Sequence, residues 1–116
     1  MDFAPPVIIK DAEIVLHLEI DVPQKNRQRF LEFCGRAFPV YESIGNAKMT
    51  LYEDTVKPGR FNEVGYYRTL EDYKRGEHAI RNDPAQARLI EEWRTLLNGQ
   101  PKVTVYRRVN EPKPAP

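Results

Sequence analysis

Two residues suited to proton transfer lie close together on one predicted strand. His17 and Glu19 are separated by a single residue, so a β-strand carries both side chains on the same face. A carboxylate beside an imidazole orients the ring and keeps it basic enough to accept a proton. The pair is therefore a hypothesis for general base catalysis. The alternative interpretation is a hydrogen-bonded pair inside a subunit interface.

The second histidine, His78, lies beside Glu77 in the polar half of a predicted helix. A histidine at such a position is typical of a helix surface or groove, and this is the simpler interpretation. Histidine side chains can also transfer protons in catalysis, so a catalytic base is the alternative. His17 and His78 are thus the two catalytic candidates.

Tyrosines, arginines and one glutamate on the predicted strands form a second group of candidates. Tyrosine hydroxyls can orient a phenolic ligand in an aromatic pocket. Arginines can hold an anionic group or pair with a carboxylate on a neighbouring strand. Packing within the sheet and cross-strand ion pairing are the alternative roles. The candidate ligand-binding residues are Glu19, Tyr52, Tyr66, Tyr67, Arg68, Tyr106 and Arg108.

Metal and nucleotide sites have little support in the sequence. Two histidines and the single Cys34 do not lie at the ligand spacing of a zinc or iron site. The chain has no glycine-rich phosphate loop. Cys34 and Trp93 fall on apolar helical stripes, so we expect both in the core. We predict no metal site and no cofactor.

The composition is that of one small domain. The 116 residues carry 18 Lys and Arg against 17 Asp and Glu, which gives a net charge of +1. This balance does not favour binding to nucleic acid or to an anionic membrane. The longest apolar runs are too short to span a bilayer, and the N-terminus lacks the pattern of a secretory signal. With a lone cysteine, these features predict a cytoplasmic protein.

Alternating apolar residues predict four strands. The clearest is 13–21, where the even positions are apolar. Strands at 48–56 and 61–68 are joined by 57–60, which has proline second and glycine third, as a type II turn requires. A tight turn between adjacent strands predicts an antiparallel hairpin. The fourth strand is predicted at 102–109.

Apolar stripes at three- and four-residue spacing predict two helical regions. The first follows Pro23, and we expect Pro39 to end it and 41–46 to be a connection. The second begins at Thr69, which with Asp72 has the form of a capping box. It is interrupted at 82–84.

Within that interruption, Asp83 is the expected N-cap of a new helical segment and Pro84 its first residue. Gly99 and Pro101 are the expected stop after the segment.

The order of elements predicts a ferredoxin-like β-α-β-β-α-β fold. This fold is a four-stranded antiparallel sheet with two helices on one face. We expect an N-terminal arm at 1–12, either without regular structure or with a short edge strand at 7–9. A single domain at 13–109 and a disordered proline-rich tail at 110–116 should follow.

One face of the predicted sheet lies under the helices. Its expected residues include Val103, Val105 and Val109. The other face carries the candidates named above, although the register of the third strand is left open between Tyr66 and Tyr67. That second face either closes on a second copy of the chain or meets water.

The stretch YYRTLEDYKRGEHAIRNDPAQARLIEEWRTLL resembles the second half of proteins in the dimeric α+β barrel superfamily. Antibiotic-biosynthesis-monooxygenase-like domains are its best-known small members. The shared pattern is an aromatic strand end, a helix begun by Thr69, His78 further along, and the break at 82–84. The resemblance implies a homodimer formed through the sheet faces, with a cavity between sheet and helices in each subunit and His78 near its mouth.

The superfamily includes cofactor-free monooxygenases, isomerases and haem-degrading enzymes. Haem-degrading members use an asparagine on the first strand and a tryptophan followed by a histidine on the second helix. Here His17 stands on the first strand and Trp93 follows His78, so we expect no haem. The resemblance implies a homodimer that binds a small aromatic or hydrophobic molecule, with monooxygenase-like or isomerase-like activity. The alternative is a non-catalytic homodimer with a structural, regulatory or ligand-sensing role.

Overall fold

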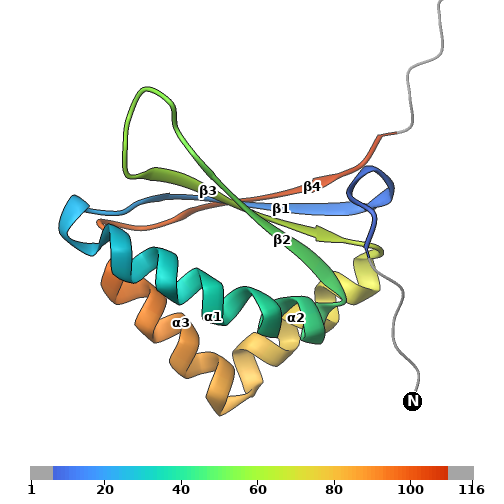
Figure 1. Ribbon diagram of the computed structural model, residues 1–116. Helices are drawn as coiled ribbons and strands as arrows, with labels where there is room; N and C mark the ends of the chain where they lie inside the picture. The colour runs from blue at the N-terminus through green and yellow to red at the C-terminus, as the bar shows by residue number, and fades with distance from the viewer. Residues whose placement is uncertain (1–6, 110–116) are drawn as a thin grey trace, which may run out of the picture.

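The computed structural model describes residues 7–109, and within them a four-stranded antiparallel sheet has helices on one face (Figure 1). The predicted order of strands and helical regions is confirmed, with the second helical region divided in two. The elements are the short 3-10 helix η1 (Ile9–Asp11), β1 (Ile14–Asp21), the 3-10 helix η2 (Gln24–Asn26), α1 (Arg27–Gly45), β2 (Ala47–Glu53), β3 (Arg60–Tyr67), α2 (Leu70–Asn82), α3 (Pro84–Leu96) and β4 (Lys102–Arg107).

The strands lie in the order β2-β3-β1-β4, all antiparallel to their neighbours. The predicted hairpin of β2 and β3 is confirmed. In its turn, the Arg60 N–H donates to the Lys57 carbonyl at 3.2 Å, and Gly59 has a φ of 90°. A Cβ at Gly59 would lie 2.6 Å from the Val22 carbonyl oxygen, so glycine is required there for two reasons.

Helix α1 is longer than the sequence predicts. Pro39 lies inside it, and the helix ends only at Gly45, followed by Asn46 in the left-handed region at φ 50°. The expected end at Pro39 and the expected connection at 41–46 are therefore wrong. The reason is that Tyr41 continues the apolar stripe of α1 into the core. Burying this face outweighs the cost of a proline in a helix, about 3 kcal/mol.

Both predicted caps in the second helical region are confirmed. The Thr69 hydroxyl accepts the Asp72 N–H at 3.1 Å and starts α2. The Asp83 carboxylate accepts the Ala85 N–H at 2.9 Å and starts α3, whose first residue is Pro84. The cap redirects the chain, so that α2 and α3 meet at an angle below the sheet (Figure 1).

Strand pairing determines which residues of β3 face the helices. Leu18 of β1 lies opposite Glu63, and Ile14 lies opposite Tyr67. Since side chains alternate along a strand, Glu63 and Tyr67 share the helix-covered face with the apolar residues of β1. Tyr66 is on the other face, which we call the outer face. The register that the sequence left open is thereby decided.

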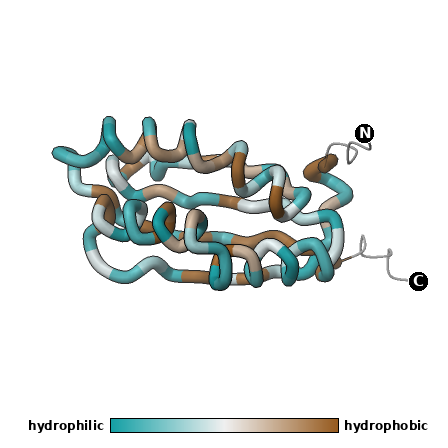
Figure 2. Tube along the Cα trace, turned by 90° about the horizontal axis from the view of Figure 1, so that it is seen from below, coloured by the Kyte–Doolittle hydropathy of each residue, from teal (hydrophilic) through white to brown (hydrophobic). Residues whose placement is uncertain are grey.

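The main core lies between α1, α3 and the sheet, around Phe30 and Phe33. Cys34 and Trp93 belong to it, as predicted. A smaller cluster holds Tyr67. Figure 2 shows the mixed hydropathy of the helices seen from below, as expected for elements with one apolar face against the sheet.

Strand β4 is not covered in the predicted way. Val103, Val105 and Val109 are 57%, 44% and 81% exposed, so the expectation that they pack under the helices is wrong. The physical reason is that β4 is an edge strand, and the two core clusters are built from the other strands and the helices.

The predictions for the two ends of the chain have different outcomes. In the predicted arm, Ile9–Asp11 forms a 3-10 helix where a short edge strand was considered. The proposed disordered tail at 110–116 lies outside the described residues. No helix between residues 7 and 109 has both the length and the apolar character needed to cross a membrane.

Candidate functional site

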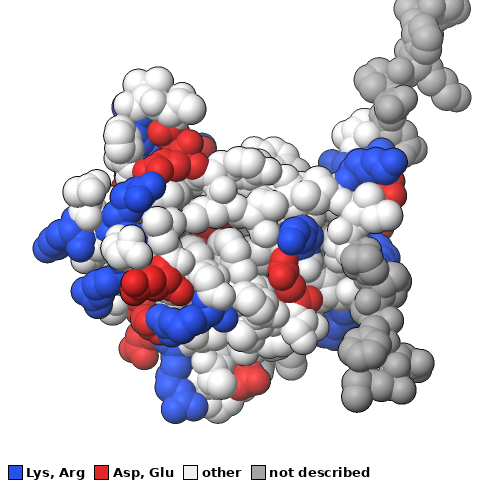
Figure 3. Space-filling view, viewed as in Figure 1, with Lys and Arg blue, Asp and Glu red and all other residues white. Residues whose placement is uncertain are grey.

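A partly open cavity of about 60 Å³ lies between the sheet and the helices. This volume holds a few water molecules or a compact organic group. The walls come from three strands and three helices and are almost entirely apolar. The lining residues are Leu16, Leu18, Tyr41, Met49, Glu63, Tyr67, Ile80, Ile90 and Trp93. Figure 3 shows charged side chains of both signs interspersed over much of the surface, with a mostly uncharged region between α1 and the sheet.

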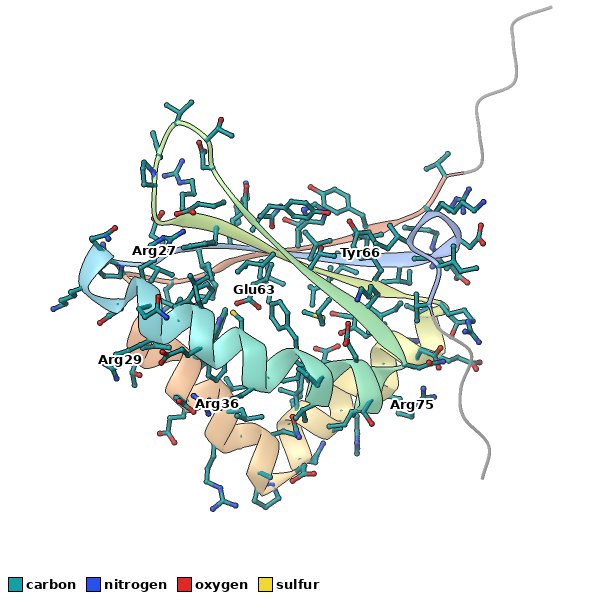
Figure 4. All side chains as sticks on the ribbon, viewed as in Figure 1. Arg27, Arg29, Arg36, Glu63, Tyr66 and Arg75 are labelled. Carbon is teal, nitrogen blue, oxygen red and sulfur yellow. The ribbon has the colours of Figure 1, made fainter. Side chains whose placement is uncertain are left out.

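Glu63 is the charged residue of this cavity wall. Its side chain points from β3 into the layer between sheet and helices, and the residue is only 3% exposed (Figure 4). The Trp93 indole Nε1 donates a hydrogen bond to Glu63 Oε1 at 2.7 Å. Within the described part of the chain, the Trp93 indole is the hydrogen-bond donor to this carboxylate, and it bonds to Oε1.

Burial changes the proton affinity of Glu63. Desolvation raises its pKa to about 7, and the hydrogen bond from Trp93 limits the rise because it stabilises the charged form. A carboxyl group with such a pKa is present in both protonation states near neutral pH. It can therefore accept or release a proton at little cost, which is the property of a general acid or base.

The neighbouring acidic groups behave differently. Burial, followed by the charge of Glu63, raises the pKa of the Cys34 thiol and of the Tyr41 hydroxyl well above their ordinary values. Burial also raises the pKa of Tyr67 to about 12. These three groups stay protonated at neutral pH. Glu63 is thus the titrating group of the cavity.

On the outer face, His17 and Glu19 have separate partners. Asn62 Nδ2 lies 2.9 Å from His17 Nδ1, and the Tyr106 ring meets the imidazole edge-on with ring centres 5.0 Å apart. Glu19 forms an exposed ion pair with Lys102 at 3.6 Å. The two residues share a face, as predicted, but the imidazole is oriented by Asn62.

Tyr52 and Tyr66 lie on the same outer face, from neighbouring strands. Hydrogen bonding of the Tyr52 hydroxyl, first to Thr50 and then to Tyr66, lowers the pKa of Tyr52. Burial raises the pKa of Tyr66. Together with Tyr106, which is half exposed, they form an aromatic surface rich in hydroxyls.

The other candidates lie at separate places. His78 is exposed on α2, in a shallow depression of about 200 Å³ with Lys74 and Arg81. Arg108 follows the end of β4, where its guanidinium donates to the Lys10 carbonyl. Arg68 is half-buried, and its carbonyl accepts the Glu13 N–H at 3.3 Å.

Of the candidates taken from the sequence, Tyr67 alone lines the cavity with Glu63. The catalytic and ligand-binding roles of the candidates taken from the sequence stay predictions.

Glu63 is a functional candidate that the sequence pattern did not identify. A signal was present, because Phe61, Glu63 and Tyr67 alternate on β3 and the glutamate is the acidic member of an otherwise apolar face. Using that signal required the strand register, which the sequence left open. The apolar stripe predicts Trp93 in the core, but it does not predict the hydrogen bond to Glu63, which lies 30 residues away in the chain.

No group of three or more His, Cys, Asp or Glu residues within the described part of the chain is arranged to hold a metal ion.

Comparison with known proteins gives matches at the level of structure. No family model and no curated protein sequence matches the chain. A conserved protein from Methanosarcina mazei Go1 superposes with a TM-score of 0.73 at 13% identity, covering 85% of this chain and 95% of that one. A proposed antibiotic biosynthesis monooxygenase from Deinococcus radiodurans gives 0.68 at 13% identity, covering 88% and 98%.

A third match is SnoaB from Streptomyces nogalater, described as a cofactor-independent oxygenase. Its TM-score is 0.71 at 11% identity, covering 86% of this chain and 96% of SnoaB. The chain has the antibiotic-biosynthesis-monooxygenase-like fold. The resemblance seen in the sequence is thereby confirmed for the fold. At these identities the shared fold does not identify a substrate, so the substrate class has to be inferred from the site.

Proposed function

We propose that the protein binds a small aromatic or hydrophobic molecule in the cavity between sheet and helices and oxidises it without a cofactor. The observation that carries the proposal is the titrating Glu63 carboxylate in an otherwise apolar cavity. Apolar walls with few polar groups are typical of small-molecule sites. The similarity to SnoaB supports oxygenase chemistry as the reaction type.

The proposed chemistry begins with removal of a proton from the substrate. A base with a pKa near 7 is suited to this step at neutral pH, and Glu63 has such a pKa. The resulting electron-rich anion is open to oxidation by dioxygen. A CH₂ group oxidised in this way loses two hydrogens and becomes a carbonyl with one oxygen atom, while the second oxygen leaves as water. An isomerase would use the same proton acceptor and return the proton at another carbon.

The proposal includes a homodimer formed through the outer faces of two sheets. Tyr52 and Tyr106 are 52% and 51% exposed there, and burial of such aromatic residues favours association. In such a dimer His17, Glu19 and Tyr66 would lie inside the barrel. The catalytic roles of His17 and His78, and a cytoplasmic location, are parts of this proposal.

A non-catalytic homodimer is the second candidate. The contacts of His17 with Asn62 and Tyr106 favour this candidate. One ring nitrogen is already engaged by Asn62, as expected for a residue that packs in an interface. On this hypothesis the outer face serves assembly, and the cavity serves ligand sensing or stays filled with water.

The test is dioxygen consumption with a panel of hydroxylated one-, two- and three-ring aromatic compounds, without added metal or flavin. We expect uptake of one dioxygen per product formed, with no hydrogen peroxide released. Ile90→Phe, which fills the cavity, should abolish uptake, while Glu91→Gln on the exposed side of α3 should leave it unchanged. Absence of uptake with every compound would favour the non-catalytic homodimer.

The two histidine candidates are tested in the same assay. His17→Ala and His78→Ala are expected to lower turnover while the midpoint of thermal unfolding stays close to that of the wild type. Unchanged turnover in both variants would remove them as catalytic residues.

A further inference from the structure

The carboxylate of Glu63 limits what the cavity can bind. Trp93 donates to Oε1, so Oε2 is the oxygen that a ligand in the cavity can use. When a ligand displaces water from the cavity, a carboxylate oxygen left without a hydrogen bond carries a free-energy cost, which a suitably placed donor on the ligand removes. The site is therefore complementary to a molecule that is apolar over most of its surface and donates one hydrogen bond.

We infer that Glu63 Oε2 accepts a hydrogen bond from the hydroxyl of a small phenol or enol bound in the cavity. This inference rests on the proposed function, because it names the substrate class for the same cavity. The ring or apolar part would lie against Leu16, Leu18 and Ile90, which line the walls. The hydroxyl would lie next to the carboxylate that the proposed reaction uses as its base.

A hydroxyl fits the site better than an ammonium group. An ammonium carries three N–H donors, each of which needs an acceptor when water is excluded, whereas a hydroxyl carries one. The carboxylate has one oxygen left, and most other wall residues are aliphatic or thioether side chains. An ammonium in this cavity would lose its hydration without replacing it.

The apolar wall also extends past the cavity. On the helix-covered face, Leu16 lies opposite Val105 and Leu18 lies opposite Val103. These two valines are 44% and 57% exposed, so apolar surface continues from the cavity to the edge strand β4. A ligand larger than the cavity can therefore place its hydroxyl at Glu63 and lay its remaining apolar part along β4.

The inference predicts a pH dependence of binding. A hydrogen bond to an ionised carboxylate is about twice as strong as one to a neutral group. Affinity for a phenol should therefore rise as pH increases through the pKa of Glu63. A simple phenol stays neutral over this range because its own pKa is close to that of tyrosine, about 10.

The experiment is isothermal titration calorimetry of the full chain with phenol and with anisole at pH 5.5 and pH 8.5. Anisole has the same ring, but its methyl ether has no O–H to donate. We expect phenol affinity to rise about tenfold between the two pH values, since a charged acceptor adds about 1.4 kcal/mol, and anisole affinity to stay constant. Glu63→Gln should abolish the pH effect on phenol and leave anisole binding unchanged.

Two further measurements keep the test independent of how the Glu63 variant folds. At pH 6, wild-type protein should release a fraction of a proton per bound phenol and none per bound anisole, as read from titrations in buffers of different ionisation enthalpy. Trp93→Phe should move the pH midpoint of phenol binding upwards, because the lost hydrogen bond no longer holds the pKa of Glu63 down.

The outcomes separate this inference from the proposed function. If neither phenol nor anisole binds, the small-molecule cavity itself fails. If both bind but phenol affinity does not respond to pH in the wild type, Glu63 is not the hydroxyl acceptor and the inference is overturned. Tighter binding of benzylamine than of phenol would also overturn it, because the site would then select cations.

Discussion

The Trp93 indole donates to the Glu63 carboxylate at 2.7 Å, and the two residues are 30 positions apart in the chain. The bond joins α3 to β3 across the cavity, so one contact both holds a helix on the sheet and sets the protonation of the buried acid. Because the carboxylate is desolvated and has this one donor among residues 7–109, its charge depends strongly on its surroundings.

Stability should depend on pH through Glu63. Its pKa is raised by burial from 4.5 to about 7 in the folded protein. The neutral form is thus favoured by folding, and the resulting stability is fully present below pH 4.5 and is lost as pH rises through 7. The size of this loss is on the order of 3 kcal/mol.

Glu63→Gln should remove that dependence. When the pH is raised from 5 to 8, the free energy of unfolding of the wild type should therefore fall relative to that of the variant. Urea unfolding at each pH measures it, and Glu91→Gln on the exposed face of α3 is the matched control. Parallel pH curves for the wild type and Glu63→Gln would contradict the raised pKa.

Trp93→Phe should destabilise the protein more at pH 8 than at pH 5. The phenyl ring keeps most of the packing but loses the N–H donor, and a hydrogen bond to a charged group contributes about 1.5 to 3 kcal/mol. The cost should be largest where Glu63 is ionised. In the Glu63→Gln background the same substitution should have an equal cost at both pH values, which a double-mutant cycle measures.

The caps of α2 and α3 should each contribute to stability. Thr69→Ala and Asp83→Ala remove side chains that accept the Asp72 and Ala85 N–H groups. The expected loss is about 1 kcal/mol each in urea unfolding. Ser43→Ala, an exposed serine inside α1, is the control and should change stability little. A cap variant as stable as the control would show that the cap is not needed.

Pro39→Ala should stabilise the protein. Pro39 is exposed within α1 and lacks the N–H that an interior helical residue donates. Alanine restores this hydrogen bond, with an expected gain of about 1 to 3 kcal/mol. Pro101→Ala, outside the helices, should not stabilise, because it only adds freedom to the unfolded chain. Equal effects at both sites would contradict the helical explanation.

Association through the outer face should depend on its aromatic residues. Tyr106→Glu replaces an exposed aromatic ring beside Val15 and His17 with a charged group on that face, and it should weaken a homodimer at least about tenfold. Sedimentation velocity at micromolar concentration measures the change. Val56→Glu makes the same change of charge at an exposed residue of the β2–β3 turn and should leave association unchanged. A wild-type protein that sediments as a monomer would contradict the barrel.

The sequence by itself determined the order of elements, the hairpin turn at Gly59 and the caps at Thr69 and Asp83. Each of these features depends on residues close together in the sequence, where backbone conformation and local hydrogen bonds decide the structure.

Only the tertiary structure decided that α1 continues past Pro39, that Tyr67 faces the helices while β4 stays uncovered, and that Glu63 is buried beside Trp93. These features depend on which elements come together from distant parts of the chain. Burial, and with it the pKa of Glu63, is a property of that packing.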